Sequence, residues 1–233
     1  MPSDRETRVV IATCFRLPGR IDAARFAPAR IGGLDLAAAM ALADLLPLLG
    51  CGEEAAALAF DELSLGAADD LSGRALRAIA GEERVHDALL KRLAHALPEP
   101  KSAESALRAA RRFHIDLGLG GVDLQFAKIA AIDASVCTVL GRLLRRGGPA
   151  SSDETVRFTL ARIRRDEARH VAVSRRLSLA RGVSVAARDA AVAARGALAG
   201  ILRLGGDAFD ALGVDPDRLV RDVARLPAGL LSA

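Results

Sequence analysis

GEERVHDALL, residues 81–90, and RDEARHVAV, residues 165–173, decide the fold of this chain. Each contains Glu-x-x-His, a spacing that puts both side chains on one face of a helix. Around each pair, apolar residues recur every three or four positions, which predicts a helix whose core-facing stripe carries the acid and the imidazole. The stripes comprise Leu76, Ile79, Glu83, His86, Leu90, Leu93 and Leu97 in the first helix, and Val156, Leu160, Ile163, Glu167, His170, Ser174 and Leu177 in the second.

The composition of the whole chain also favours helices. Of 233 residues, 51% are hydrophobic but only 3% are aromatic, and there is no Tyr or Trp. A core of Ala, Leu, Val and Ile favours helix, whereas an all-β fold draws on β-branched and aromatic strands. The lack of tyrosine also excludes chemistry that needs a tyrosyl radical or a phenolate ligand.

The helical pattern divides the chain into segments joined by connections of very different length. Two short turns, near residues 66–71 and 147–150, predict two antiparallel hairpins. More than twenty residues separate the two hairpins, enough for a further helix. Two hairpins with one long crossover indicate an all-α four-helix bundle. The expected helices span residues 34–50 (broken or kinked near Pro47 and Gly50), 52–65, 72–97, 121–146, from the capping box at Ser151 to 181, 183–204 and 215–225.

We expect three regions along the chain. Residues 1–33 form an N-terminal arm, in which VVIATCF is a short strand or an extended segment and LPGR is a turn. Residues 34–182 form the bundle, and residues 183–233 form a helical extension packed on it.

Two further acids point toward the predicted core. Glu53 shares a helical face with Phe60 and Leu63, and Asp133 shares one with Phe126 and Leu140. Glu53 precedes Glu83, and Asp133 precedes Glu167, by offsets that bring each to the depth of its partner pair in an antiparallel hairpin. The neighbouring Glu54 shares a helical face with Asp61, which makes it less well placed, and it remains the alternative to Glu53.

Together these residues predict a dinuclear metal site, because unpaired carboxylates in an apolar seam cost several kcal/mol and a metal relieves that cost. Four carboxylates balance two divalent ions, and oxygen plus imidazole ligands suit iron or manganese. Glu83 and Glu167 would bridge the ions, while Glu82 and Asp166 could accept the free ring N–H of the histidine on the opposite helix. The predicted ligand set is Glu53, Glu83, His86, Asp133, Glu167 and His170.

The alternative to a metal site is a metal-free bundle with buried ion pairs. His95 and His114 fall outside the pattern and are interpreted as surface or structural residues. Cys137 lies one turn from Asp133 and is interpreted as a small buried residue or a cavity-lining one.

Charge, cysteine usage and hydropathy bear on the partners and the cellular location of the protein. The 33 basic residues exceed the 29 acidic ones by four, and the arginines are scattered, which disfavours nucleic acid as a partner without excluding it. Cys14, Cys51 and Cys137 fit neither a disulfide framework nor a zinc ribbon, which indicates a reducing, cytoplasmic location. The apolar stretch from Leu34 to Cys51 is interrupted by charges and a proline, so no membrane association is expected.

The stretches EEAAALAF, GEERVHDALL, AAIDASVCTVLG and RIRRDEARHVAV resemble the ferritin-like di-iron carboxylate superfamily, in particular bacterial ferritin-like domain proteins. The resemblance covers about residues 52–181 and implies two iron ions, with Mn/Fe or Mn/Mn as alternatives. The family pattern supports Glu53, followed by Phe60 seven residues later. Asp133 departs from that pattern, because the family usually has Glu there and an aspartate reaches less far.

The resemblance implies an O₂-dependent di-iron oxidoreductase of the monooxygenase or oxidase type. Such an enzyme would hydroxylate, N-oxygenate or desaturate a small organic substrate, with an external electron donor and with Phe60 or Phe126 shielding the site. The lack of tyrosine argues against a ribonucleotide reductase subunit, and the lack of Cys-x-x-Cys argues against a full rubrerythrin. The terminal extensions argue against a ferritin cage. A tRNA-modifying di-iron hydroxylase and a non-enzymatic helical metal-binding or interaction protein stay open, as does a homodimer formed through the terminal helices.

Overall fold

The computed structural model describes residues 13–101 and 103–232. Helices are the only regular secondary-structure elements in those ranges. The sequence-based expectation of an all-α fold is therefore confirmed. The elements are a short 3₁₀ turn, η1 (Ala23–Arg25), and the helices α1 (Leu36–Leu65), α2 (Asp70–Ala94), α3 (Ala103–Leu117), α4 (Val122–Leu143), α5 (Pro149–Ser152), α6 (Glu154–Ala180), α7 (Val185–Leu204), α8 (Gly206–Ala211) and α9 (Pro216–Ala224).

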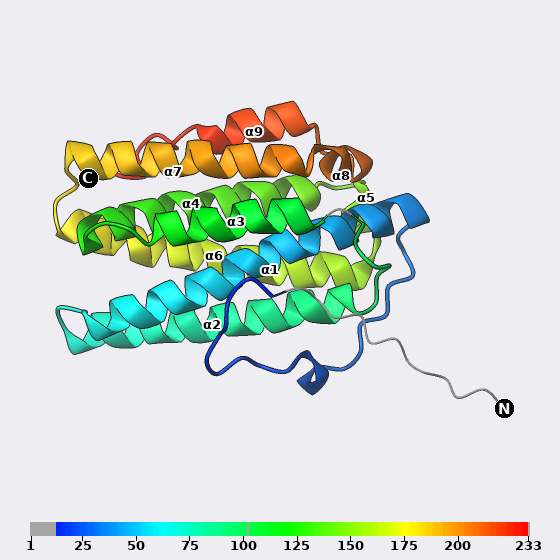
Figure 1. Ribbon diagram of the computed structural model, residues 1–233, viewed down its shortest axis with the longest axis horizontal. Helices are drawn as coiled ribbons and strands as arrows, with labels where there is room; N and C mark the ends of the chain where they lie inside the picture. Colours follow the sequence, from blue (N-terminus) through cyan, green and yellow to red (C-terminus); the bar gives the residue numbers. More distant parts are fainter. Residues whose placement is uncertain (1–12, 102, 233) are drawn as a thin grey trace.

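Two antiparallel helix pairs build the central bundle. A tight turn joins α1 to α2, and the short α5 joins α4 to α6 (Figure 1). Between the pairs lies the long connection, which carries the additional helix α3 as the sequence suggested. This arrangement brings α2 and α6 side by side in opposite directions, and that pairing positions the two Glu-x-x-His motifs.

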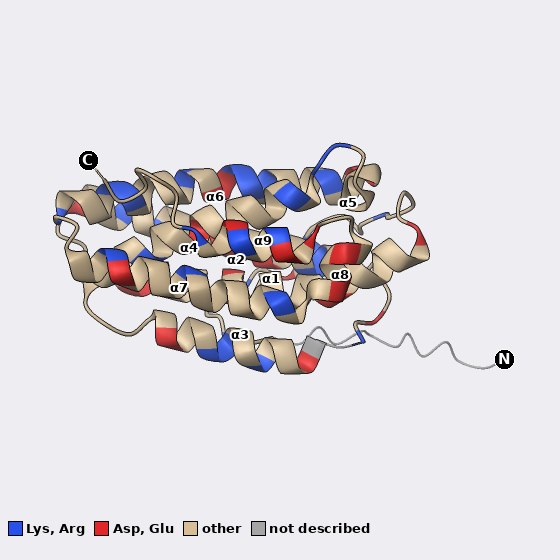
Figure 2. Ribbon diagram, turned by 90° about the horizontal axis from the view of Figure 1, so that it is seen from above, with Lys and Arg blue, Asp and Glu red and all other residues tan. Residues whose placement is uncertain are grey.

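The remaining helices cover the bundle on one side. α7 packs along α4, α9 packs on α7, and α8 contacts the first part of α1. α3 lies against both α1 and α7, where it forms an outer wall (Figure 2). Figure 2 also shows Lys and Arg on several helices, including a series along α6.

The core of the four long helices has two apolar layers. Phe60, Leu76, Phe126 and Leu177 belong to the layer near the α1–α2 turn. The larger layer at the other end is formed by residues such as Leu46, Leu90, Leu140 and Leu160, and it continues into the contacts with α7, α8 and α9. Between the layers, each of the four helices contributes acids or histidines, so the polar residues are enclosed by aliphatic packing above and below.

A break near Pro47 and Gly50 is wrong, because α1 continues through both residues, whereas the alternative of a kink stays a prediction. Proline removes one backbone N–H and destabilises a helix interior. Here Leu42, Leu45 and Leu46 are buried in the larger apolar layer. That packing outweighs the local cost, since tertiary burial commonly overrides intrinsic propensity.

The predicted start of the last bundle helix at Ser151 is also wrong. Asp153 is the N-cap of α6, and its carboxylate accepts a hydrogen bond from the Val156 N–H. The same carboxylate accepts from the N–H groups of Gly32 and Gly33. A Cβ on Gly33 would stand 2.8 Å from the Ser152 carbonyl oxygen, so this close approach requires glycine. The cap therefore also anchors the end of the N-terminal arm.

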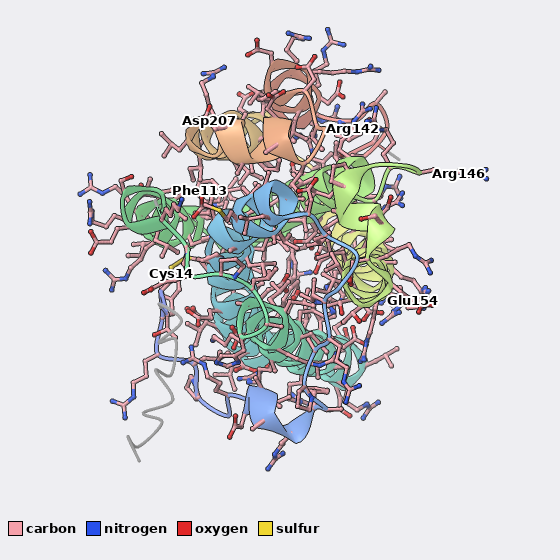
Figure 3. All side chains as sticks on the ribbon, turned by 90° about the vertical axis from the view of Figure 1, so that its right-hand side faces the viewer. Cys14, Phe113, Arg142, Arg146, Glu154 and Asp207 are labelled. Carbon is pink, nitrogen blue, oxygen red and sulfur yellow. A yellow bond between two sulfur atoms is a disulfide. The ribbon has the colours of Figure 1, made fainter. Side chains whose placement is uncertain are left out.

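The described part of the N-terminal arm is tied to the bundle by a disulfide that the sequence analysis excluded. Cys14 is bonded to Cys51 of α1, and Cys137 is free. Figure 3 shows Cys14 near Phe113 of α3. The cysteine argument for a reducing compartment therefore loses its basis. The LPGR turn is confirmed at Pro18 and Gly19, whereas residues 9–12 of VVIATCF lie outside the described residues.

Two helices, α1 and α4, are long and apolar enough to cross a membrane by length and composition alone. In each, at least half of the most apolar window is buried inside the protein, at 50% in α1 and 61% in α4. Glu53 and Asp133 also lie within these helices. Core helices of a bundle have this character, so these two helices are weak evidence for a membrane span.

Replacing Cys14 by Ala should destabilise the protein by about 2–4 kcal/mol, because the disulfide closes a long loop in the unfolded chain. Denaturant unfolding followed by circular dichroism measures this loss. The control is Cys137→Ala, which removes a thiol outside the disulfide and should leave the transition nearly unchanged. Equal stability of the Cys14→Ala variant and the parent protein under oxidising conditions would contradict the role given to the bond.

Candidate metal centre

The six predicted ligands lie in the interior, supplied by α1, α2, α4 and α6. None of the six is more than 6% exposed, and His86 and His170 are fully buried. The residues form the polar layer between the two apolar layers of the core. These buried side chains are Glu53, Glu83, His86, Asp133, Glu167 and His170.

His86 and His170 are held in matching positions on the antiparallel helices α2 and α6. The Nδ1 atom of His86 lies 3.1 Å from Glu53 Oε2, and its Nε2 lies 3.2 Å from Asp166 Oδ2. The Nε2 atom of His170 lies 2.8 Å from Glu82 Oε2. Each ring therefore turns Nδ1 toward the cluster and Nε2 toward an acid of the opposite helix, as the sequence suggested for Glu82 and Asp166.

Two carboxylates lie between the two imidazoles, whose ring centroids are 5.9 Å apart. Glu83 approaches His86 Nδ1 with Oε2 at 3.2 Å and His170 Nδ1 with Oε1 at 3.0 Å. Glu167 Oε1 lies 3.5 Å from both Nδ1 atoms. Both glutamates thus occupy the position from which one carboxylate could contact two ions.

The cluster has a compact part and a looser part. Ligand atoms from Glu53, Glu83, His86 and Glu167 all lie within 4.8 Å of one another, a grouping that could hold a metal ion. Asp133 and His170 stand outside this grouping, although both are buried beside it. His170 Nδ1 nevertheless lies 3.0 Å from Glu83 Oε1, and Asp133 lines the same cavity as Glu83 and Glu167.

Three oxygen or nitrogen atoms of the cluster that could bind a metal make no hydrogen bond of regular geometry within the described ranges. These atoms are Glu83 Oε1, Asp133 Oδ2 and His170 Nδ1. Buried polar atoms are normally satisfied, so unpaired ones indicate a missing partner. Carboxylate oxygens and imidazole nitrogens are ligands for iron or manganese, and the residues present therefore fit such ions.

The electrostatics of the metal-free cluster favour bound protons. Burial and then the charge of Glu83 raise the pKa of Glu53, and burial with the charges of Glu167 and Glu83 raises that of Asp133. Burial lowers the pKa of His170, but the Glu167 and Glu83 carboxylates close to Nδ1 outweigh it and bring the value to about 11. The pKa of His86 is raised in the same way, with Glu53 contributing most. Protons thus occupy positions that a cation would take.

Arg169 was not predicted, yet it links the two acids behind the histidines. Its guanidinium donates to Glu82 Oε1 at 2.9 Å and to Asp166 Oδ1 at 2.7 Å. Because these acids come from α2 and α6, Arg169 fixes both imidazole partners at once. The i, i+3 spacing of Asp166 and Arg169 was the available sequence signal.

Glu54 belongs to a separate buried network, which supports Glu53 as the α1 residue that faces the cluster. Glu54 Oε2 accepts hydrogen bonds from the N–H groups of Cys14 and Phe15, and Oε1 accepts from Arg20 and Lys91. The pairing with Arg20 and Lys91 satisfies a carboxylate that is 1% exposed. Glu54 thus fastens the N-terminal arm.

A cavity of about 150 Å³ reaches the cluster from one side. Glu53, Glu83, Asp133 and Glu167 form part of its wall, and most of the remainder is aliphatic. It lies between α1, α3, α4 and α7, with α3 as the outer wall. Small side chains such as Ala56 leave this space open.

The other sequence-based assignments have mixed outcomes. Phe60 lines the cavity and meets the His170 ring edge-on, whereas Phe126 is buried in the apolar layer away from the lining. His95 is exposed, as expected. His114 is partly buried and lines the cavity, so the structural alternative describes it better than the surface one. Cys137 is partly buried and does not line the cavity.

No family model, curated protein or solved structure matches this chain. The side chains of the cluster and the adjoining cavity are therefore the basis for inferring a function.

The metal-free protein should lose stability as the pH rises from about 7 to about 9. The pKa of His170 is raised from 6.5 to about 11, so above 6.5 the folded protein holds a proton that the unfolded chain releases. The free energy of unfolding therefore falls with increasing pH across that window. Thermal unfolding in excess chelator measures the slope.

His170→Gln should flatten this slope, whereas His95→Gln, at an exposed position, should preserve it. A chelated parent protein whose stability is constant or rises over the same range would contradict the protonation described here.

Proposed function

We propose that the protein is a ferritin-like dinuclear metal protein, with a di-iron centre between the two helical hairpins. The connectivity supports this fold, since a long connection carrying α3 separates the hairpins. The reciprocal placement of His86 and His170 around Glu83 is the observation that carries the proposal. A single buried ion pair would not require two equivalent imidazole positions that share one carboxylate.

The six residues divide naturally between two ions. Glu53 and His86 would hold one ion, and Asp133 with His170 would hold the other. Glu83 and Glu167 would be shared, because each lies between the imidazoles. Four carboxylates neutralise two divalent cations, which removes the cost of burying unpaired charges.

Iron is the proposed metal, with Mn/Fe or Mn/Mn as alternatives. Two ferrous ions supply electrons for the reduction of O₂. The protein would hydroxylate, N-oxygenate or desaturate a small organic molecule bound in the cavity. Hydroxylation would need two electrons from the substrate and two from an external donor, which would keep the ions in the ferrous state.

The surrounding residues would hold the ligands and limit access. Asp166 and Glu82 orient the imidazoles through Nε2, which leaves each Nδ1 directed to the metal positions. Phe60 covers one side of His170. The aliphatic cavity wall excludes water from the substrate while leaving it in contact with the carboxylate side of the cluster.

Elemental analysis of protein loaded anaerobically should find two iron or manganese ions per chain. Glu53→Gln should lower the metal affinity by at least about tenfold, since it removes a ligand. The matched control is Glu54→Gln, one residue along the same helix, which should lower stability but preserve metal content. Glu83→Ala should abolish binding of both ions.

If metal loading is unchanged in Glu53→Gln, or is lost only in Glu54→Gln, the proposed ligand set contains the wrong carboxylate of α1. Absence of bound metal in the parent protein, together with an unchanged melting temperature in Glu83→Ala, would contradict the metal site. Absence of metal with a lowered melting temperature in Glu83→Ala would favour the buried ion-pair bundle.

The ferrous protein should consume O₂ faster than free ferrous iron at the same concentration. An oxygen electrode with parallel optical spectra measures this, and Glu83→Ala is the inactive control. If metal is bound but O₂ uptake does not exceed that of free iron, the protein is a metal-binding or interaction module rather than an oxygenase.

Action on tRNA is a second candidate, favoured by the surface of α6. Arg162, Arg164, Arg165 and Arg176 are exposed on this helix, and Figure 2 shows basic residues along it. Such a surface suits phosphate contacts, which weaken as salt increases. Stimulation of O₂ uptake by tRNA at low salt, and its loss at high salt, would favour this candidate over a small substrate.

A further inference from the structure

The cavity is elongated. Its wall includes Leu48 and Glu62 at either end of a fifteen-residue stretch of α1, and Gln125 and Val139 at either end of an equal stretch of α4. At about 1.5 Å per helical residue, each stretch is about 21 Å long. A space that follows two helices over this length fits an extended chain better than a compact ring system.

The two ends of the cavity differ in polarity. Leu48, Val139 and Leu202 form an aliphatic end. Gln125 and the exposed Glu62 lie at the other end, near the α3–α4 turn, and His114 lies between the two ends, at the level of Gly52. A molecule with an apolar tail and a polar group matches this distribution.

His114 is a hydrogen-bonding group of this wall that is not engaged by the protein. In the described part of the chain, no hydrogen bond involves its ring, which packs edge-on against Phe113 with centroids 4.9 Å apart. A methyl group on Gly52 would stand 3.8 Å from His114 Nε2, so the ring faces the turn of α1 that precedes Glu53. The available ring nitrogen therefore lies beside α1 at Gly52, one residue before Glu53, in the cavity that the cluster carboxylates also line.

The charge of the lining restricts the ligand further. No Lys or Arg belongs to the cavity wall formed by the described residues, whereas four carboxylates of the cluster do. Burial lowers the pKa of His114 to about 4, so its ring is neutral near pH 7. An anionic head group would have no counter-charge among these side chains.

We propose that the cavity binds an uncharged, extended aliphatic molecule carrying one hydroxyl or carbonyl group, and that His114 determines specificity by hydrogen-bonding to that group. This inference rests on the proposed function, for which it defines the substrate class. Because His114 faces the start of the Glu53 turn, the carbon presented to the cluster is close to the polar group rather than at the far end of the tail.

Calorimetric titration of the metal-free, full-length protein with 1-octanol, n-octane and octanoate tests the proposal independently of metal chemistry. Octanol should bind with one site per chain and at least about tenfold more tightly than octanoate. His114→Phe should weaken octanol binding about threefold to tenfold, the value of one neutral hydrogen bond, and leave octane binding unchanged. His114→Gln should restore most of the affinity for octanol.

Two variants control for folding and location. Ala56→Phe fills the cavity and should reduce the binding of octanol and octane together. His95→Phe makes the same substitution at an exposed histidine and should change neither. Circular dichroism confirms that each variant remains helical.

Octanol binding that is insensitive to both His114→Phe and Ala56→Phe would overturn the proposal, as would tighter binding of octanoate than of octanol. Metal content measured on the same preparations separates the outcomes. The protein could bind octanol with the expected response to His114→Phe and yet take up no metal. That result would support the ligand site and contradict only the di-iron function.

Discussion

Burial of four carboxylates and two imidazoles between aliphatic layers is the constraint on which the rest of this structure depends. Each charged group in such a position loses several kcal/mol of solvation unless protons, ion pairs or cations compensate it. In the metal-free state, raised pKa values show protons filling this role on His170 and on the acids Glu53 and Asp133. The helices must therefore meet closely enough at this level to share charge, and the apolar layers on both sides hold them there.

Much of the cluster was predictable because helical periodicity indicates which residues lie on the core-facing side of a helix. Glu83 and Glu167 interrupt otherwise apolar stripes, and the same pattern selected Glu53 over Glu54 and placed Asp133 inward. What periodicity does not report is contact between distant segments. The cap at Asp153, the continuity of α1 through Pro47 and the disulfide all depend on tertiary neighbours, namely Gly33 for the cap and the larger apolar layer for the helix. The cavity was equally inaccessible, since it arises where α3 folds over small side chains.

The N-terminal arm and α3 converge on the same side of the bundle, next to the cavity. Cys51 is adjacent to the cavity-lining Gly52, and its disulfide holds Cys14 against α3. Glu54 receives hydrogen bonds from the backbone of Cys14 and Phe15. Residues of one α1 turn thus differ in what they contact. Glu53 faces the cluster, while Cys51 and Glu54 hold the N-terminal arm, which packs against α3. The unexpected disulfide is therefore linked to the same site as the predicted acids.

The doublets Glu82-Glu83 and Asp166-Glu167 explain how two helices can build a nearly symmetric centre. Adjacent helical residues point about 100° apart, so when the second acid faces the cluster, the first is directed toward the neighbouring helix. Because α2 and α6 are antiparallel, the relation is reciprocal: Glu82 supports His170, and Asp166 supports His86. Arg169 then bridges the two supporting acids and compensates the negative charge that they add. A lone Glu-x-x-His pair on either helix would lack this mutual orientation, which is why the paired motif carries far more information than its separate halves.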